Sequence, residues 1–260
     1  STTNANAQTT SLTYDALGRP TSTTLPGETS GDSTTSISYT VWCSGTSAQA
    51  PCTEIDSTQR LDSGTTVTSR AFYDGEGHLV ETRKPAPNSQ DVVQYANYDP
   101  QGHLVFVSVP YFVTAYTGGP GAGAFATPDA TQSGASTTYD GLDRTLSTTN
   151  ALSQQTSQSY GIACGSIPSD SACYEQTLTI DGNSHQSGTL TDALGREIYT
   201  QAYTGTGPYT VYSTTAYTFN HQGLVKQILY PDGKSLATMT YDKAGRETAS
   251  TDPDRGSESY

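Results

Sequence analysis

The sequence has few of the residues that build an ordinary hydrophobic core. Only 33% of its 260 residues are hydrophobic, with one Met, one Trp and five Phe, whereas Tyr occurs 18 times. A core in this chain must therefore use tyrosine rings, which bury their apolar faces while the hydroxyl keeps a hydrogen-bond partner or reaches water. Low hydrophobicity with high net charge is also typical of disorder. The regular spacing of the tyrosines, described below, favours a folded protein.

Positive charge and long apolar runs are scarce as well. Twelve Lys and Arg against 25 Asp and Glu give a formal net charge of −13, and no basic cluster is present. Such a surface repels phosphate backbones and anionic headgroups, so we expect no nucleic-acid partner. No apolar run approaches the ~20 residues of a membrane helix, so we expect no membrane insertion. The chain starts at Ser1 without Met or a signal-peptide pattern, so we expect a segment of a longer protein or a processed product, with any targeting signal outside it.

Recognisable catalytic and cofactor motifs are missing. The sequence contains no Gly-x-Ser-x-Gly elbow, no His-Glu-x-x-His and no phosphate loop. Carboxylates are abundant, and any two could form a glycosidase pair, but the sequence does not set their separation. Two acidic segments, 181–183 and 252–254, lack the graded ligand spacing of a calcium loop and are interpreted as turns. We therefore predict a protein that is not an enzyme and holds no cofactor or metal.

The four cysteines form two pairs with the same spacing. Cys43 and Cys52 are nine residues apart, as are Cys164 and Cys173, and each pair follows a Tyr-containing segment with strand character. We predict a disulfide within each pair, since closing such a loop stabilises a hairpin by roughly 3 kcal/mol. Zinc is the alternative, but this spacing is wider than usual and no His accompanies either pair. Disulfides indicate a secreted, periplasmic or cell-surface protein.

One short repeat runs through the chain. An aromatic residue is followed by Asp or Asn, two variable positions, Gly and usually a basic residue. This order is that of a turn, in which Asp or Asn caps its own backbone and Gly takes the left-handed conformation, closing a hairpin with a bulge at the Gly. One copy has Asp143 in place of Gly, and Asp tolerates a left-handed backbone better than most residues. The residues assigned to these structural turns are Tyr14, Asp15, Gly18, Arg19, Tyr73, Asp74, Gly77, Tyr98, Asp99, Gly102, Tyr139, Asp140, Arg144, Asp192, Gly195, Arg196, Asn220, Gly223, Tyr241, Asp242, Gly245 and Arg246.

Segments on either side of the turns alternate with a period of two, as strands do, for example 77–83, 102–107 and 214–219. No window of ten or more residues has a helical pattern. The predicted fold class is all-β, with tandem hairpins in an extended antiparallel sheet. The repeat arginines could bind acidic sugars, but their recurrence with the turn favours a ladder in which each guanidinium bonds a neighbouring turn. His78 and His103 fill the same slot, which favours a structural role for them.

A longer period lies over the short repeat. The pairs Tyr39 and Tyr160, Cys43 and Cys164, and Tyr98 and Phe219 are each 121 residues apart. Self-similarity at a fixed period is typical of solenoid-like architectures, in which each unit buries its face against its neighbours. We predict two supermodules, residues 1–138 and 139–260, each with one stapled hairpin, within one continuous structural domain.

The recurring Tyr-Asp-x-x-Gly-Arg, with trailing segments such as Tyr230-Pro231-Asp232-Gly233, resembles the YD-repeat, or Rhs-repeat, family over residues 14–256. Members of that family include bacterial Rhs and wall-associated polymorphic toxins, the C component of Tc insecticidal toxins and the extracellular shell of teneurins. The resemblance implies a long sheet that spirals into a hollow shell, which in the toxins looks like a container for a C-terminal toxic domain. The stapled insertions depart from the family's core motif. The Asp-Pro-x-Gly-Leu segment, which resembles the Rhs self-cleavage region, is absent here, so autoproteolysis is not carried over.

Two functions follow as expectations. The first is structural, a segment of a secreted or cell-surface bacterial Rhs-type protein that encloses or presents a C-terminal toxin or effector, with the rest of its own chain as partner. The alternative is an adhesin-like module that binds glycans or a cell-surface receptor through Tyr-rich strands and the stapled loops. A shell should bury its stripe of tyrosines on a concave face, whereas a lectin-like module would leave clustered Tyr and Trp42 exposed.

Overall fold

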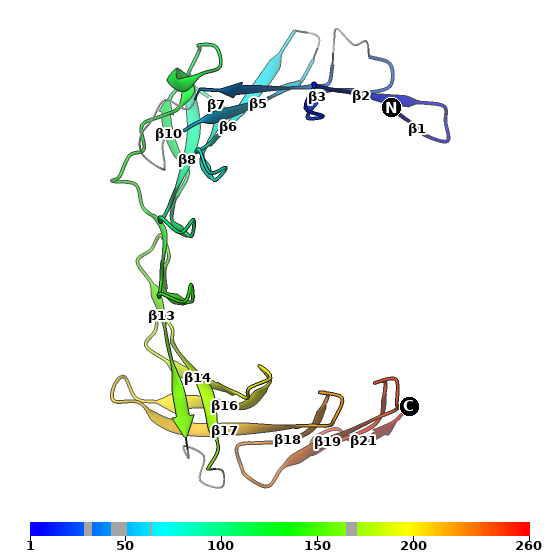
Figure 1. Ribbon diagram of the computed structural model, residues 1–260, viewed down its shortest axis with the longest axis vertical. Coiled ribbons are helices and arrows are strands. Elements are labelled where there is room, and N and C mark those ends of the chain that lie inside the picture. Colours follow the sequence, from blue (N-terminus) through cyan, green and yellow to red (C-terminus); the bar gives the residue numbers. More distant parts are fainter. Residues whose placement is uncertain (29–32, 43–50, 63, 165–170) are drawn as a thin grey trace. The chain divides into compact units, whose positions relative to one another are not determined.

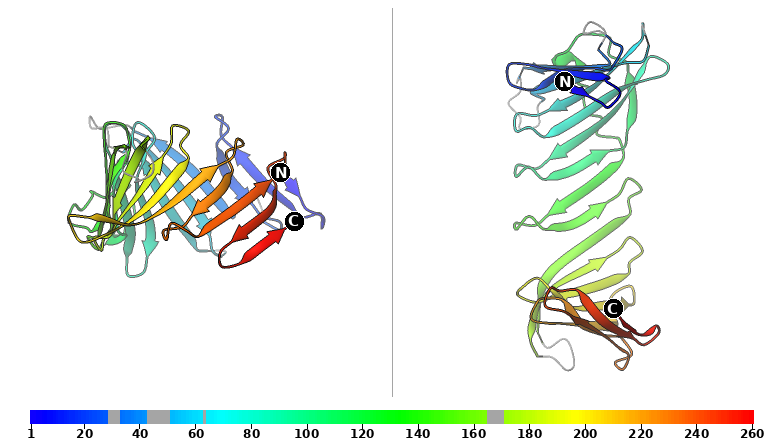
Figure 2. Two further views of the ribbon diagram at one scale, coloured as in Figure 1. Left: turned by 90° about the horizontal axis from the view of Figure 1, so that it is seen from below. Right: turned by 90° about the vertical axis from the view of Figure 1, so that its right-hand side faces the viewer.

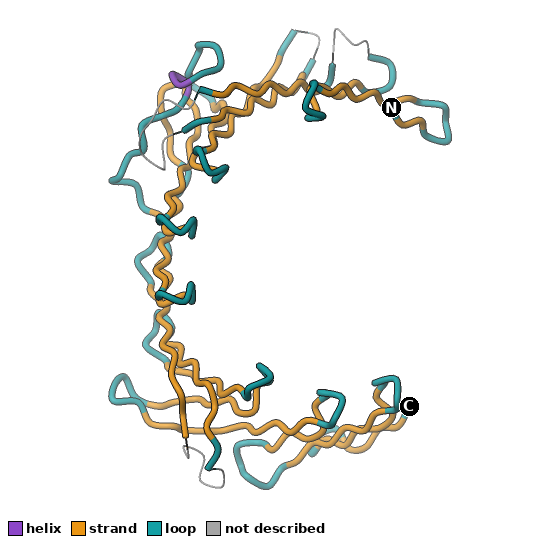
Figure 3. Tube along the Cα trace, in the orientation of Figure 1, coloured by secondary structure: helices purple, strands orange, loops and turns teal. Residues whose placement is uncertain are grey.

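The computed structural model describes residues 1–28, 33–42, 51–62, 64–164 and 171–260. In this part of the chain the structure is almost entirely strands and turns, with one short 3-10 helix, η1 (Ala122–Ala124) (Figures 1 and 3). The all-β prediction is confirmed. The chain forms two compact units, Ser1–Thr137 with Asn150–Leu152, and Thr138–Thr149 with Ser153–Tyr260. Whether the 121-residue supermodules act as structural repeats stays a prediction.

In the first unit the strands pair in chain order as antiparallel neighbours (Figure 2). In addition to β7, β8 pairs through its start with β10 and through its end with β9, and β9 also pairs with β11. Thr, Val and Tyr supply many strand positions, and all three suit a pleated, half-buried surface. The strands are β1 (Thr2–Thr3), β2 (Thr9–Tyr14), β3 (Pro20–Thr24), β4 (Thr35–Val41), β5 (Thr53–Arg60), β6 (Thr66–Tyr73), β7 (Leu79–Ala86), β8 (Gln90–Tyr98), β9 (Leu104–Ser108), β10 (Tyr111–Thr114) and β11 (Gly134–Tyr139), the last of which spans the division between the units.

The second unit repeats the same plan. Each of its strands pairs antiparallel with the next one along the chain. Tandem hairpins, as predicted from the sequence, therefore build the sheet in both units. The strands are β12 (Thr145–Thr149), β13 (Gln155–Cys164), β14 (Cys173–Ile180), β15 (Gln186–Thr191), β16 (Glu197–Thr204), β17 (Thr210–Phe219), β18 (Val225–Leu229), β19 (Leu236–Tyr241), β20 (Glu247–Asp252) and β21 (Gly256–Ser259).

The main hydrophobic cluster lies in the first unit, where residues 115–133, here called the cover segment, lie over one face of the sheet. Phe72 of β6 is fully buried and packs between the rings of Trp42 and Phe125, at centroid distances of 6.3 and 5.5 Å. Val80 and Ala124 complete the cluster. The cover segment thus supplies the second layer that a single sheet lacks, since a sheet face buries its apolar residues only against another element.

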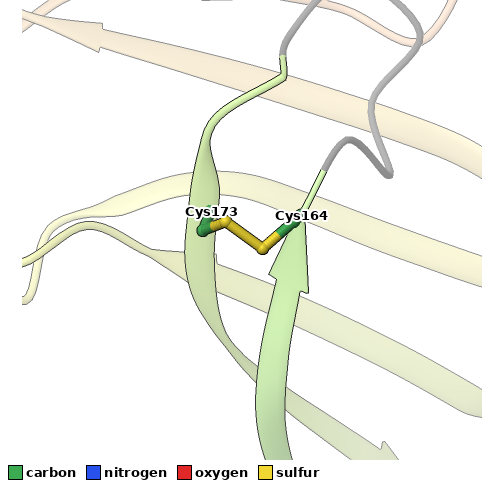
Figure 4. Close-up of a disulfide and its surroundings, with 2 residues drawn as sticks. All are labelled: Cys164 and Cys173. Atoms are coloured by element: carbon green, nitrogen blue, oxygen red, sulfur yellow. A yellow bond between two sulfur atoms is a disulfide. The ribbon is translucent and has the colours of Figure 1, made fainter.

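The predicted staple of the second unit is present. Cys164 and Cys173 are direct register partners at the ends of β13 and β14, and their sulfurs are bonded (Figure 4). The Cys43–Cys52 prediction lies outside the described residues, because Cys43 is not among them. In the described part of the chain, no helix is both long and apolar enough to cross a membrane.

Candidate functional site

Each repeat turn is closed from inside by one carboxylate. At the first turn, Asp15 Oδ1 accepts hydrogen bonds from the backbone N–H groups of Leu17 and Arg19, both at 2.9 Å. Asp15 Oδ2 accepts the Arg19 Nε–H at 2.7 Å. The backbone adds Asp15 N–H to Arg19 O and Gly18 N–H to Asp15 O, with Gly18 at φ +77°. We call this arrangement, in which an acidic residue holds the four residues after it, the carboxylate clamp.

The carboxylate clamp recurs at most of the predicted turns and at one further turn. Asn220 makes the same two backbone bonds through its amide oxygen but faces Leu224, which has no basic group. His78 and His103 replace arginine and place Nδ1 at 3.0 and 2.9 Å from the carboxylate of their own turn. Clamps with a basic partner are centred on Asp15, Asp74, Asp99, Asp140, Asp181, Asp192 and Asp242.

The clamp at Asp181 was not recognised as a repeat from the sequence. It is preceded by Ile180 where most other copies have an aromatic residue, and Ser184 stands in the glycine position with φ +64°. The remaining signal is the Asp–His spacing of four residues, since His185 reaches the Asp181 carboxylate at 3.3 Å. That spacing, rather than the aromatic or the glycine, is therefore the most persistent feature of the turn.

Six of the described repeat hairpins carry two irregularities, of which the sequence predicted one. The bulge at glycine is visible at Asp15, which bonds both Gly18 N–H and Arg19 O. The second lies in the outgoing strand: Tyr14 pairs with Pro20 and Thr13 with Ser22, so one extra residue is inserted between them. The same shift occurs between β6 and β7, β8 and β9, β15 and β16, β17 and β18, and β19 and β20. Such bulges increase the local right-handed twist of a sheet.

An aromatic ring from the next strand lies over the basic residue of several clamps. The Arg19 guanidinium carbon lies 4.1 Å from the Tyr39 ring centroid, and the corresponding Arg144–Tyr160 distance is 4.2 Å. His78 stacks on the Tyr98 ring at a centroid distance of 4.5 Å, and the Arg196 guanidinium carbon lies 4.9 Å from the Phe219 ring centroid. Where this aromatic is tyrosine, its hydroxyl donates to the carbonyl that follows the clamp, as in Tyr39 to Pro20, Tyr98 to Leu79 and Tyr160 to Thr145.

This geometry corrects one prediction. The arginines were expected to bond the turn of a neighbouring repeat, whereas Arg19, Arg144, Arg196 and Arg246 each bond the Asp four residues before them. The connection between repeats is made by the aromatic ring instead. The rings involved are Tyr39, Tyr98, Tyr160 and Phe219, which are the same residues that define the 121-residue period.

The clamp carboxylates are held in their anionic form. The backbone N–H of Arg19, and then its guanidinium, hold the pKa of Asp15 below its usual value. The guanidinium of Arg196 has the same effect on the pKa of Asp192. A carboxylate that is fully used by its own turn is poorly suited to act as a general acid. Asp74, Glu76 and His78 bring three potential metal-ligand atoms within 4.8 Å of one another, but Asp74 and His78 already bond each other as a clamp.

The second group of charged residues was not predicted from the sequence. It lies under the cover segment, and we call it the buried charge cluster: Glu54, Asp56, Arg70, Glu81, Arg83 and Asp91. Arg83 Nε pairs with Asp91 at 2.6 Å, and Arg70 Nε lies 3.1 Å from Glu54 and 3.5 Å from Asp56. Glu54 and Glu81 are each only 1% exposed. Charged residues are rarely buried to this degree unless they are paired.

The buried charge cluster forms hydrogen bonds with the backbone of the cover segment. Glu54 Oε2 accepts the Gly121 N–H at 2.5 Å, and Glu81 Oε1 accepts the Ala126 N–H at 3.0 Å. Arg83 donates to Ala124 O and to Thr114 O, both at 2.7 Å, while Asp91 accepts the Tyr116 N–H at 3.0 Å. The cluster therefore satisfies backbone groups of a segment that has almost no secondary structure of its own.

Burial shifts the pKa of two members of the cluster. It raises the pKa of Glu81 to about 8 and that of Glu54 to about 7, the latter assisted by its hydrogen bond with Asp56. The sequence carried a weak signal of this cluster. Glu54 and Asp56, and likewise Glu81 and Arg83, occupy alternate positions of strands, so each pair points to one face of the sheet.

Comparison with known proteins gives a family profile that matches two parts of the chain and a similar fold. The family profile described as RHS Repeat matches residues 1–30 and 219–257. These two ranges contain the clamps of Asp15 and Asp242 and the related turn of Asn220. No curated protein matches the chain.

Among solved structures, a chain of the "Crystal Structure of TcdB2-TccC3-Cdc42" is similar over 98% of this chain, with a TM-score of 0.68 and 12% sequence identity. This chain spans 18% of the length of that one. At such low identity the similarity shows a shared fold. The repeated turn and the matched profile agree in placing Rhs-type repeats at residues 1–30 and 219–257, and the shared fold extends over nearly the whole chain.

Proposed function

We propose that this chain is a structural segment of a secreted or cell-surface bacterial Rhs-type protein. In this proposal the segment forms part of a β-shell that encloses or presents a C-terminal toxin or effector domain. The observation that supports it is that the repeat residues make internal contacts. Asp and Arg close turns, and aromatic rings join turns to the next strand. These are the contacts of a wall built from one unit many times over.

Two findings support the placement of this segment within a longer, secreted protein. The similar fold covers 98% of this chain but only 18% of the other, so a segment of this kind also exists inside a much longer chain. That longer chain comes from a structure named for TcdB2, TccC3 and Cdc42, and the sequence resemblance independently includes the C component of Tc toxins. The Cys164–Cys173 disulfide supports an oxidising compartment, since such bonds form and persist outside the cytosol.

The adhesin-like alternative receives less support. An adhesin was expected to leave Trp42 exposed, whereas Trp42 packs edge-on against the buried Phe72 ring. Rings of the repeat tyrosines lie over clamps and donate their hydroxyls to backbone carbonyls. Side chains with such internal contacts are better suited to join repeats than to bind a sugar.

The test uses the full-length protein from which this segment comes, with its C-terminal region present. We expect that region to resist protease in the intact protein and to be cleaved once two clamps are broken by Asp192→Ala and Asp242→Ala. Asp254→Ala serves as control, because it changes an exposed carboxylate outside the clamps. Equal cleavage of the C-terminal region in all three proteins would reject enclosure. Binding of the segment to a glycan array, with no protection of the C-terminal region, would favour the adhesin.

A further inference from the structure

The cover segment lies on a cluster with more carboxyl groups than guanidinium groups. Four carboxyls, those of Glu54, Asp56, Glu81 and Asp91, face two guanidiniums, Arg70 and Arg83. Arg83 is committed to Asp91 at 2.6 Å. Arg70 is shared between Glu54 and Asp56, at 3.1 and 3.5 Å. If every group were ionised, the site would therefore hold two uncompensated negative charges.

Glu81 is the most isolated of these carboxyls. In the part of the chain that the structure describes, its Oε2 is buried and has no hydrogen-bond partner, while Oε1 accepts the Ala126 N–H. The other ionisable groups near the cover segment are phenols and one further acid: Tyr95 and Tyr111 on the strands, and Tyr116 and Asp129 on the segment. None of them adds a positive charge, and the one guanidinium that attracts Glu81, that of Arg83, is paired with Asp91. An ionised and unpaired carboxylate in such a place is costly, and proteins usually avoid it by keeping the proton.

We propose that the cover segment is a proton-linked strap, closed on β5–β8 while Glu81 and the Glu54–Asp56 pair each hold one proton, and released when these protons are lost. Two protons remove the two excess charges and leave the pairs Arg83–Asp91 and Arg70–(Glu54, Asp56) balanced. The Ala126 N–H then donates to the neutral carboxyl of Glu81, and the Gly121 N–H donates to Glu54, which shares one proton with Asp56. The inference concerns the first unit alone and does not depend on the proposed shell.

The direction of the pH effect follows from where the protons bind. When the strap opens, Glu54 and Glu81 reach water, where a glutamate has its ordinary pKa of 4.5. The closed state has the raised pKa, about 8 for Glu81 and about 7 for Glu54, so it binds more protons than the open state between these limits. Opening therefore becomes more favourable as the pH rises from about 5, by roughly tenfold per pH unit for each proton, and levels off above about pH 8.

Hydrogen exchange on the intact 260-residue chain tests this directly. Exchange of amides in residues 115–133 is followed by mass spectrometry from pH 5 to 9, after correction for the chemical exchange rate. We expect the opening constant of the strap to rise at least 100-fold between pH 6 and 8, while amides of β5–β8 stay protected. The only tryptophan of the chain, Trp42, packs against Phe72 in the hydrophobic cluster and gives a second signal. Iodide should quench its fluorescence more strongly as the pH rises over the same range.

Variants identify the groups. Glu81→Gln keeps an oxygen for the Ala126 N–H and cannot ionise, so it should lower the pH slope of opening. The double variant Glu54→Gln with Glu81→Gln should abolish the slope and keep the strap closed at pH 9. Glu175→Gln, an exposed glutamate of β14 in the second unit, should behave as the unchanged chain. The proposal is overturned if the unchanged chain shows no excess pH dependence, or if the double variant retains it.

Discussion

A single aspartate carboxylate does two separable things at each repeat turn. One oxygen accepts two backbone N–H groups, and the other accepts the basic side chain four residues on, as Asp192 does for Arg196. Asn220 separates the two tasks within the same chain, because its amide oxygen accepts both N–H groups in a turn that has no basic residue. The backbone bonds are thus common to all these turns, and the ion pair is an addition.

This separation predicts a graded response at Asp192. Asp192→Asn should lower the melting temperature less than Asp192→Ala, because asparagine keeps the two backbone bonds and loses only the pairing with Arg196. Thermal unfolding of the intact chain followed by circular dichroism measures the difference. Asp254→Ala, outside the clamps, should leave the melting temperature nearly unchanged. Equal losses for the two Asp192 variants would contradict this division of roles.

The same carboxylate predicts an effect of acid. The Arg196 guanidinium and backbone N–H hold the pKa of Asp192 below the 3.8 of an unfolded chain. Its contribution to stability is therefore present above about pH 3.8 and is lost as the pH falls through the lower folded value. Asp192→Asn should make the melting temperature less sensitive to acid between pH 4 and 2, because asparagine has no proton to gain.

Glycine at the fourth turn position is the other residue that the turn requires. Gly102 has φ +88°, and a Cβ there would lie 3.1 Å from Nε2 of His78. Gly102→Val should cost a few kcal/mol of the free energy of unfolding, since a β-branched residue is strained at positive φ. Gly141→Ala is the matched control, because Gly141 lies in another repeat turn with no positive φ and with open space around it. Urea unfolding of both variants gives the comparison, and a neutral Gly102→Val would mean that the turn tolerates other backbones.

At the scale of the hairpin, the repeat motif predicts the turn well and its surroundings poorly. Asp15, Gly18 and Arg19 interact within five residues of chain, so their spacing contains the geometry. Glu54 and Glu81 bind the backbone of residues 121 and 126, which are more than 40 positions away in the sequence. A local sequence pattern does not predict which distant segment will cover a strand face. Side-chain alternation showed which face these residues occupy, but not that the face would be buried.

The stapled hairpin allows a prediction about one element. Replacing Cys164 and Cys173 by Ser should lower stability by up to about 3 kcal/mol in the chain-entropy model. The loss should be local, because β13 is held along its length by the ladder to β14 and by β12. Hydrogen exchange should therefore quicken near Cys164 and Cys173 and remain slow near Ser157 and Ile180. Uniform loss of protection throughout β13 and β14 would show that the bond supports the whole hairpin.

At the scale of the whole chain, the two units differ in how much they bury. Most of the buried residues found in the described ranges, such as Phe72, Val93 and Glu54, belong to the first unit, whereas Leu190, Gln201 and Ala237 represent the second. The cover segment accounts for much of the difference. Stability in repeat proteins is roughly a sum of local terms, so regions that bury less should open first.

Native-state hydrogen exchange should reveal this order. We expect amides in β5–β8 to exchange most slowly in the chain and those of β18–β21 to exchange through openings of lower free energy. As the urea concentration rises, the amides of β18–β21 should exchange together through one early unfolding step, while those of β5–β8 stay protected. A single cooperative transition, with equal opening free energies in both units, would contradict the expectation.

The short reach of the carboxylate clamp also affects how the chain acquires its structure. Because each clamp joins residues only four apart, closing it costs little chain entropy, and the strands that it joins are neighbours in sequence. Contacts of this kind form fast and in any order along a chain. A hairpin can therefore be complete as soon as its own residues leave a ribosome, and each newly completed strand offers a template for the next.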